Sequence, residues 1–243
     1  MLLMDEDGIL LTESAGVLTL TMSRGENRIN PTMVALLERA LALAADADGP
    51  KALIVTSSDA KFFCNGLDIE WMATHGATAV MTMLESFWAW LARLLVLGCP
   101  TVAAITGHAF GAGAFLALSC DYRIMRTERG FLNFPEAALG MRLQKQFAEL
   151  AKAKLDAPTL RKGMLEAHRF GSDEALACGF VDSIYAMEQL PAAAQAMAVS
   201  KRADTLKLIN FNAENFSAMK KEIWTDAYRA LVRPGDAAPD ARL

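Results

Sequence analysis

The sequence lacks paired cysteines, an excess of basic residues and an N-terminus of the kind that directs secretion. Its 243 residues include four cysteines, widely spaced and without a C-x-x-C pair, so neither a zinc site nor a disulfide framework is expected. The 24 lysines and arginines are outnumbered by 28 aspartates and glutamates, which argues against a nucleic-acid partner because such binding needs a concentrated basic surface. The N-terminal stretch MLLMDEDGILL places acids where a signal peptide is apolar. These absences favour an intracellular globular protein.

Charge is also missing from residues 94–120, a stretch long enough to span a bilayer. Gly107 and Gly111 even have the spacing of a membrane helix-packing motif. Against a single helix, Pro100 is followed by a β-like apolar run, Thr-Val-Ala-Ala-Ile, that ends before Gly107. We therefore expect a buried strand, a tight glycine turn and a buried helix, and no membrane span.

The patterns of apolar residues favour an α/β fold in one domain. Residues 9–12 and 17–22 flank a turn and predict a hairpin, and Asn30-Pro31 begins a helix expected to reach about residue 45. The remaining predicted elements are strands at 52–56, 102–105, 121–125 and 180–184 and a helix at about 79–97. Strands that recur between helices indicate the α/β class.

Two glycine-containing loops could present backbone N–H groups to a ligand. The first has the sequence Phe-Cys-Asn-Gly-Leu-Asp-Ile over residues 63–69, and the second covers residues 107–114 and leads into a helix. The start of a helix leaves N–H donors unpaired and carries partial positive charge, which suits an anion. The two loops could share one oxyanion.

A single carboxylate, Glu136, lies among the apolar residues 131–140. An acid in such surroundings tends to have a raised pKa, which makes it a candidate general base near neutral pH. The alternative is that Glu136 caps a turn or forms an ion pair on a loop surface. The residues by themselves leave both interpretations open.

Three motifs together resemble one family: N-G-L-D-I, G-H-A-F-G-A-G-A-F-L-A-L-S-C-D and F-P-E-A-A-L-G. In this order and spacing they are similar to the crotonase (enoyl-CoA hydratase/isomerase) superfamily, from about residue 9 to 190. The resemblance implies a ClpP/crotonase-like spiral of ββα turns as the core domain, residues 1–190, and a helical C-terminal trimerisation region, residues 191–243. It also implies an acyl-CoA thioester substrate and an oxyanion hole built from the backbone N–H groups of Asn65 and Ala112. Coenzyme A is part of that substrate, so no separate cofactor and no metal are expected.

Two positions distinguish between the activities known in this family. Hydratases of the family have a second glutamate where this chain has Phe115, whereas Glu136 matches the one carboxylate that Δ3-Δ2-enoyl-CoA isomerases use. Adding water needs two groups, one to activate the water and one to deliver a proton. The sequence looks most like plant-type, peroxisomal isomerases that move a 3-enoyl double bond to position 2 in fatty acid β-oxidation. The alternatives are another reaction of the family, such as hydration, thioester hydrolysis or decarboxylation, or an acyl-CoA-binding protein without turnover.

The same resemblance implies where the substrate is bound. The expected substrate contacts are Lys61, Cys64, Gly66, Leu67, Asp68, Ile69, Gly111, Phe115, Pro135 and Leu139. Phe115, Phe134 and Leu139 would keep water away from the reacting carbons.

Basic residues are the expected partners of the CoA phosphates. The resemblance implies that Lys61, Arg24 and Arg28 lie in loops near the adenine and phosphates of CoA, and that Lys220 and Lys221 could reach CoA across a subunit boundary. For each of them the alternative is an ordinary solvated charge. His108, in the second glycine loop, is expected to be a core or rim residue.

The chain closes with Ala241-Arg242-Leu243, a tripeptide chemically close to the S-K-L peroxisomal address. It predicts a peroxisomal location and binding to the import receptor, the alternative being a chain end without such a role. The resemblance implies a homotrimer or a dimer of trimers. The apolar residues that could form its interface, or pack within the chain, are Leu206, Leu208, Ile209, Phe211, Phe216 and Met219.

Overall fold

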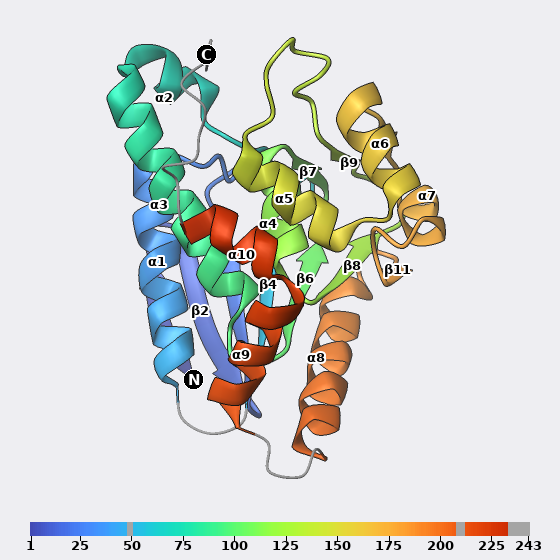
Figure 1. The fold of residues 1–243 in the computed structure, drawn as a ribbon. Helices are drawn as coiled ribbons and strands as arrows, with labels where there is room; N and C mark the ends of the chain where they lie inside the picture. Colours follow the sequence, from blue (N-terminus) through green and yellow to red (C-terminus); the bar gives the residue numbers. More distant parts are fainter. Residues whose placement is uncertain (48–50, 208–211, 233–243) are drawn as a thin grey trace.

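The computed structural model describes residues 1–47, 51–207 and 212–232 and shows two β-sheets surrounded by helices (Figure 1). Over these residues the larger sheet has seven strands in the order β1-β2-β3-β4-β6-β8-β11. It is antiparallel from β1 to β3 and parallel from β3 to β11. The strands are β1 (Leu2–Glu6), β2 (Ile9–Ser14), β3 (Val17–Met22), β4 (Ala52–Ser57), β6 (Thr101–Ile105), β8 (Tyr122–Arg126) and β11 (Ser183–Tyr185).

The smaller sheet has the order β10-β9-β7-β5 in the described part of the chain. Its strands are β5 (Phe62–Cys64), β7 (His108–Phe110), β9 (Leu132–Asn133) and β10 (Arg169–Phe170). β5, β7 and β9 are mutually parallel, and β10 joins the edge antiparallel to β9.

The helices connect the strands and cover the sheets (Figure 1). They are α1 (Pro31–Asp46), α2 (Ile69–Thr74), α3 (Ala77–Leu95), α4 (Ala112–Ser119), α5 (Lys145–Lys154), α6 (Ala157–Glu166), α7 (Ser172–Ala177), α8 (Leu190–Leu206), α9 (Ala213–Ile223) and α10 (Thr225–Val232).

One pattern repeats along the chain. β4, β6 and β8 each add a parallel strand to the larger sheet, and the chain then crosses to the smaller sheet as β5, β7 and β9 before it returns through helices. The expected α/β spiral of ββα turns is therefore confirmed.

The predicted hairpin and first helix are confirmed as well. β2 and β3 pair from Ile9↔Met22 to Ser14↔Val17, and Gly16 takes a φ of +73° in the turn, which glycine adopts without strain. The side chain of Asn30 accepts a hydrogen bond from the Met33 N–H and so caps α1.

The uncharged stretch is divided as expected. α3 ends at Leu95, β6 and β7 follow, and α4 is buried along its whole length. Among the described residues, no helix combines the length and the apolar character that a membrane crossing requires.

The strand predicted at 180–184 begins only at Ser183. Gly179 takes a φ of +71° after α7, and the Val181 N–H donates to the Ala175 carbonyl. Phe180 and Val181 are buried, so their apolar character reflects a packed helix end and not a strand.

Both faces of the larger sheet are covered, which explains why its parallel strands are apolar throughout. Val17, Ile54 and Val102 belong to one cluster with Leu190 and Ala194 of α8. On the other face, Leu18, Leu53 and Val55 belong to the main core with residues of α1 and α3.

Lys220 of α9 fastens the C-terminal helices to the core. Its ammonium is buried and donates to the carbonyls of Leu97 and Cys99, at 2.9 Å each, and to Asp121 Oδ2 at 2.6 Å. Asp121 is the carboxylate that also accepts from the Thr101 N–H and hydroxyl. Lys220 is thus committed to the core, and its expected contact with CoA is wrong.

Replacing Lys220 with Met is expected to lower the free energy of unfolding by about 3–5 kcal/mol, because it leaves a buried carboxylate and two carbonyls without their donor. Denaturant unfolding followed by circular dichroism measures this loss. The matched control is Lys221→Met, since Lys221 is the exposed neighbour. Equal stability of the two variants would contradict the role given to Lys220.

Several residues predicted to form a subunit interface lie outside the described part of the chain. Leu208, Ile209 and Phe211 lie outside the described residues, as does the tripeptide Ala241-Arg242-Leu243. Phe216 is half-buried and Met219 is 64% exposed.

Candidate active site

The site lies where three neighbouring parallel strands of the smaller sheet end. β5 ends at Cys64 and leads into the first glycine loop, β7 ends at Phe110 before Gly111, and β9 ends at Asn133 shortly before Glu136. Because the carboxyl ends of adjacent parallel strands meet at one edge of a sheet, segments about 25 to 45 residues apart are brought together. Ligand sites of α/β proteins are commonly built at such an edge.

The two glycine loops touch through positions that admit no side chain. A Cβ on Gly66 would lie 2.7 Å from the Phe110 carbonyl oxygen and 3.6 Å from the Ala112 nitrogen, and φ at Gly66 is +84°. A Cβ on Gly113 would lie 2.1 Å from the Cys64 carbonyl oxygen. Glycine is therefore required at both positions for the loops to approach each other.

The N–H of Asn65 is not free to bind an oxyanion, contrary to the prediction from sequence. It donates to the Glu26 carbonyl at 2.9 Å. The two residues on either side of Leu67 are also paired: the Gly66 carbonyl accepts from the Ile29 N–H, and the Asp68 N–H donates to the Ile29 carbonyl. No acceptor for the Leu67 N–H is found in the described part of the chain, so Leu67 offers the free donor of this loop.

Ala112 lies where the second donor was expected. Gly111, with a φ of +48°, precedes α4, and its own N–H donates to the Asn133 carbonyl. Ala112 is the first residue of the helix, so its N–H has no partner within the helix, and none is found elsewhere in residues 1–47, 51–207 and 212–232. The helix start adds partial positive charge at this point.

Glu136 reaches the same place from the third strand end. A Cβ on Gly111 would lie 3.8 Å from Glu136 Oε1, and Glu136 Oε2 is buried without a hydrogen-bond partner among the described residues. Burial raises the pKa of this carboxyl above its ordinary value, and a bond from its own backbone lowers it only in part. The structure therefore decides against a surface ion pair at Glu136.

Phe115, which the resemblance aligns with the second glutamate of hydratases, is fully buried. Its ring stacks on Phe147 with centroids 4.3 Å apart and lies 4.8 Å from the ring of Phe134. The wall expected from Phe115 and Phe134 is thus a packed aromatic cluster. Leu139, expected in the same wall, is 62% exposed in this chain and does not belong to it.

Of the remaining expected contacts, Pro135 lies beside the second glycine loop, whereas Ile69 and Asp68 lie at the start of α2. Pro135 is half-buried, with its ring 3.8 Å from the Cβ position on Gly111, whereas Ile69 is 53% exposed at the start of α2. Asp68 caps α2 by accepting from the Trp71 N–H and also binds the Asn30 amide. Asp68 therefore has a local structural role.

The side chain of Cys64, an expected substrate contact, is buried in the main core. Its thiol is fully buried and donates to the Asn27 carbonyl. Burial raises the pKa of the thiol to about 12, against a smaller lowering by a bond from Gly66, so it is inert as a nucleophile.

The basic residues expected to bind the CoA phosphates differ in whether a carboxylate already pairs with them. Arg24 pairs with Asp7, and Arg28 pairs with both Glu26 and Glu70, so these two guanidinium groups are already matched by carboxylates. Lys61 is exposed and its ammonium lies 4.8 Å from the Phe62 ring centroid.

His108 is a rim residue, as expected. It is half-buried and its ring lies 4.9 Å from Phe110 and 5.6 Å from Phe131. Burial lowers its pKa, and so do the nearby charges of Arg129, Lys61 and Arg169. A neutral imidazole in a positive neighbourhood results.

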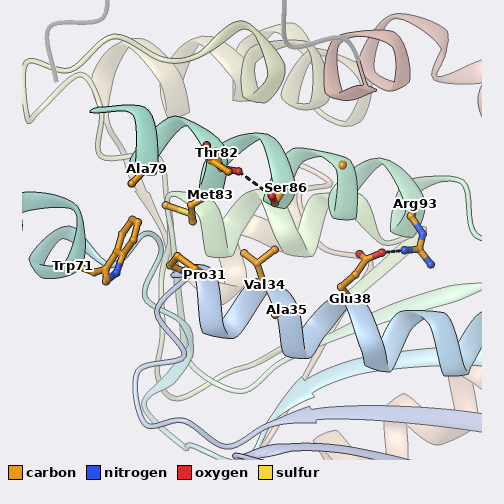
Figure 2. Close-up of a pocket in the computed structure, with 11 residues that line it drawn as sticks. Pro31, Val34, Ala35, Glu38, Trp71, Ala79, Thr82, Met83, Ser86 and Arg93 are labelled. Atoms are coloured by element: carbon orange, nitrogen blue, oxygen red, sulfur yellow. Dashed lines mark hydrogen bonds and ion pairs between the residues drawn. The ribbon is translucent and has the colours of Figure 1, made fainter. Parts of the chain in front are cut away.

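A separate groove of about 620 Å³ lies between α1 and α3. Figure 2 shows Trp71 of α2 at one end and the Glu38–Arg93 ion pair at the other. None of the residues expected to contact substrate lines it. The described residues also contain no group of three His, Cys, Asp or Glu side chains that could hold a metal ion.

Comparison with known proteins agrees with this geometry. The chain is 37% identical over 173 residues to a peroxisomal enoyl-CoA delta isomerase 2 from Arabidopsis thaliana, covering 69% of this chain and 72% of that protein. It is 33% identical to enoyl-CoA delta isomerase 3 from the same plant, covering 88% of this chain and 90% of that protein.

Among solved structures, a probable enoyl-CoA hydratase, EchA3, from Mycobacterium tuberculosis superposes with a TM-score of 0.84 at 26% identity, covering 94% of this chain and 93% of the other. The family model described as enoyl-CoA hydratase/isomerase matches residues 12–230. With this match, the spiral fold and the three converging strand ends, the chain belongs to the enoyl-CoA hydratase/isomerase family.

Proposed function

We propose that this protein is a Δ3-Δ2-enoyl-CoA isomerase that converts a 3-enoyl-CoA into the trans-2-enoyl-CoA. One observation carries the proposal. Glu136 is half-buried, and its Oε2 is buried without a hydrogen-bond partner among the described residues, beside a glycine turn where the Ala112 N–H also has no acceptor in that part of the chain. Phe115 stands where hydratases of the family have a second carboxylate, and it is buried. The plant relatives named enoyl-CoA delta isomerase support the proposal.

In the proposed first step, the Glu136 carboxylate removes a proton from C2 of the substrate. That proton is acidic because it lies between the thioester carbonyl and the C3=C4 double bond. Its loss gives a dienolate whose negative charge rests mainly on the thioester oxygen. The N–H groups of Leu67 and Ala112 would bind that oxygen, and such donors are typically worth roughly 10²–10³ in rate each.

In the second step, the protonated Glu136 returns the proton to C4, and the double bond moves to C2=C3. The carboxylate is regenerated, so one residue serves as base and then as acid. The raised pKa of Glu136 suits both halves, because the group must take and release a proton near neutral pH. The buried ring of Phe115 offers water no group that would activate it.

The test is to supply trans-3-hexenoyl-CoA and, separately, crotonyl-CoA and to follow the ultraviolet absorbance of the conjugated thioester. The proposal expects rising absorbance with the 3-enoyl substrate and little change with crotonyl-CoA. Efficient hydration of crotonyl-CoA without any reaction of the 3-enoyl substrate would instead favour a hydratase. Release of free CoA would favour a thioester hydrolase, and binding without turnover would favour an acyl-CoA-binding protein.

Location and assembly belong to the same proposal. We infer a peroxisomal enzyme of fatty acid β-oxidation, supported by the peroxisomal name of one plant relative and by the Ala241-Arg242-Leu243 end as a ligand of the import receptor. Deleting these three residues from a tagged protein should leave it cytosolic.

The proposed homotrimer, or dimer of trimers, is tested by light scattering of the purified protein.

A further inference from the structure

The segment before α1 runs alongside the first glycine loop and pairs with its backbone. The Asn65 N–H donates to the Glu26 carbonyl, the Ile29 N–H donates to the Gly66 carbonyl at 2.8 Å, and the Asp68 N–H donates to the Ile29 carbonyl at 2.9 Å. These bonds fix the loop on both sides of Leu67. The Leu67 N–H has no acceptor of its own in the described residues, and the parallel bridge between Ile29 and Leu67 leaves it facing away from Ile29.

Glu26 adds a second hold on the same loop through its side chain. Its Oε2 accepts from Asn65 Nδ2 at 2.8 Å and from Arg28 Nε at 2.6 Å. Arg28 in turn donates to Glu70 Oε1, in the first turn of α2, at 2.9 Å. Four side chains therefore tie the segment before α1, the glycine loop and α2 together.

The carboxylate of Glu26 is well suited to this task. The bond from Asn65 and then the bond from Arg28 lower its pKa below the ordinary range, so it remains ionised at neutral pH and is a strong acceptor. Asn65 is thus bound to Glu26 twice, once through its main-chain N–H and once through its amide side chain.

We propose that Glu26 is a positioning residue for the oxyanion hole: by holding Asn65 through its carboxylate, it fixes the following Gly66–Leu67 peptide so that the Leu67 N–H meets the thioester oxygen. The inference rests on the proposed acyl-CoA chemistry, but Glu26 itself acts only through Asn65. Displacing a donor by a fraction of an ångström weakens its stabilisation of the negative charge in the transition state more than it weakens binding of the uncharged substrate. The expected signature is a loss in kcat with little change in KM.

The experiment compares Glu26→Ala, Glu26→Gln, Asn65→Ala and the double variant Glu26→Ala/Asn65→Ala. Glu26→Ala should lower kcat for 3-hexenoyl-CoA about tenfold, less than the roughly 10²–10³ lost with an entire oxyanion donor, with KM within about twofold. Glu26→Gln should retain most of the rate because its amide oxygen still accepts from Asn65. The double variant should be no slower than the slower single variant, because both changes remove one interaction.

A second readout does not depend on isomerase turnover. The absorbance of bound 2,4-hexadienoyl-CoA shifts to longer wavelength when N–H donors polarise its carbonyl, and Glu26→Ala should reduce that shift while Glu26→Gln keeps it. If the native protein shifts the probe but does not isomerise, the proposed function fails and Glu26 is still tested by the probe. If the native protein does not shift the probe, the oxyanion hole and with it this inference are wrong.

The matched control is Glu6→Ala, which breaks the exposed Glu6–Arg39 ion pair, outside the network of Glu26, Asn65, Arg28 and Glu70, and should leave kcat and the probe shift unchanged. Full kcat and full probe shift in Glu26→Ala would overturn the inference. So would equal losses in Glu26→Gln and Glu26→Ala, since they would point to the charge of Glu26 rather than its hydrogen bond. Losses that multiply in the double variant would also overturn it.

Discussion

Replacing Glu136 with Gln is expected to lower kcat for the isomerisation by roughly 10²–10⁴-fold, the usual contribution of a positioned general base. The amide has nearly the same shape but cannot take up the C2 proton. With Glu136 as the proposed base, the rate of the native protein should also fall as the pH is lowered through the raised pKa of this carboxyl. Rates measured between pH 5 and 9 with 3-hexenoyl-CoA test both statements.

The same variant should be more stable than the native protein at neutral pH. A carboxyl whose pKa is raised in the folded state binds its proton more tightly there than in the unfolded chain, so stability falls as the pH rises from the ordinary value to the raised one. Glu136→Gln should remove this loss, and the difference should vanish in acid. Near-normal turnover of Glu136→Gln, or an equal rate loss in the control Glu166→Gln, an exposed glutamate on α6, would contradict the role of Glu136.

Replacing Gly66 with Ala is expected to lower kcat by about 10²-fold through displacement of the neighbouring donor. The added Cβ would lie 2.7 Å from the Phe110 carbonyl oxygen, and φ at this position is +84°, so the loops must separate. Separation moves the Leu67 N–H away from the N–H of Ala112. Steady-state kinetics with 3-hexenoyl-CoA measures the loss.

A matched control separates strain of the backbone from displacement of the donor. Gly179 has a similar φ of +71°, but a Cβ there would have no neighbour within 4 Å. Gly179→Ala should therefore lower stability slightly and leave kcat unchanged. Equal rates for the two variants would show that the contact between the glycine loops does not hold the donor in place.

Strands β2, β3, β4, β6 and β8 of the larger sheet were predictable because they carry apolar runs that a sequence pattern reveals. The edge strand β1 was not predicted, and β11 begins three residues later than expected. The smaller sheet was not predictable, because β9 and β10 have two residues each and β5 and β7 have three. Strands this short show no periodicity. Their positions depend on pairing with strands elsewhere in the chain, and that pairing is what assembles the site.

Some residues of the candidate site could likewise be predicted from the sequence, and others could not. Glu136 could be proposed from its apolar surroundings, and Ala112 from the resemblance together with its place at the start of a helix. The prediction of Asn65 as a donor fails because its N–H is bonded to Glu26, and the pairing of the loop with Glu26 and Ile29 leaves the Leu67 N–H without an acceptor in the described residues. The role of Glu26 and the neutralisation of Arg24 by Asp7 depend on contacts between distant residues. Such contacts leave no local signal in a sequence.

The stacking of Phe115 also limits how this protein can change its reaction. A glutamate at this position would place a carboxylate between the rings of Phe134 and Phe147, without a partner and at a cost of several kcal/mol. Natural proteins have only about 5–15 kcal/mol of stability in total. A single Phe115→Glu step toward a hydratase is therefore expected to yield a poorly folded intermediate. The evolutionary route between the two activities would have to replace the surrounding aromatic side chains first.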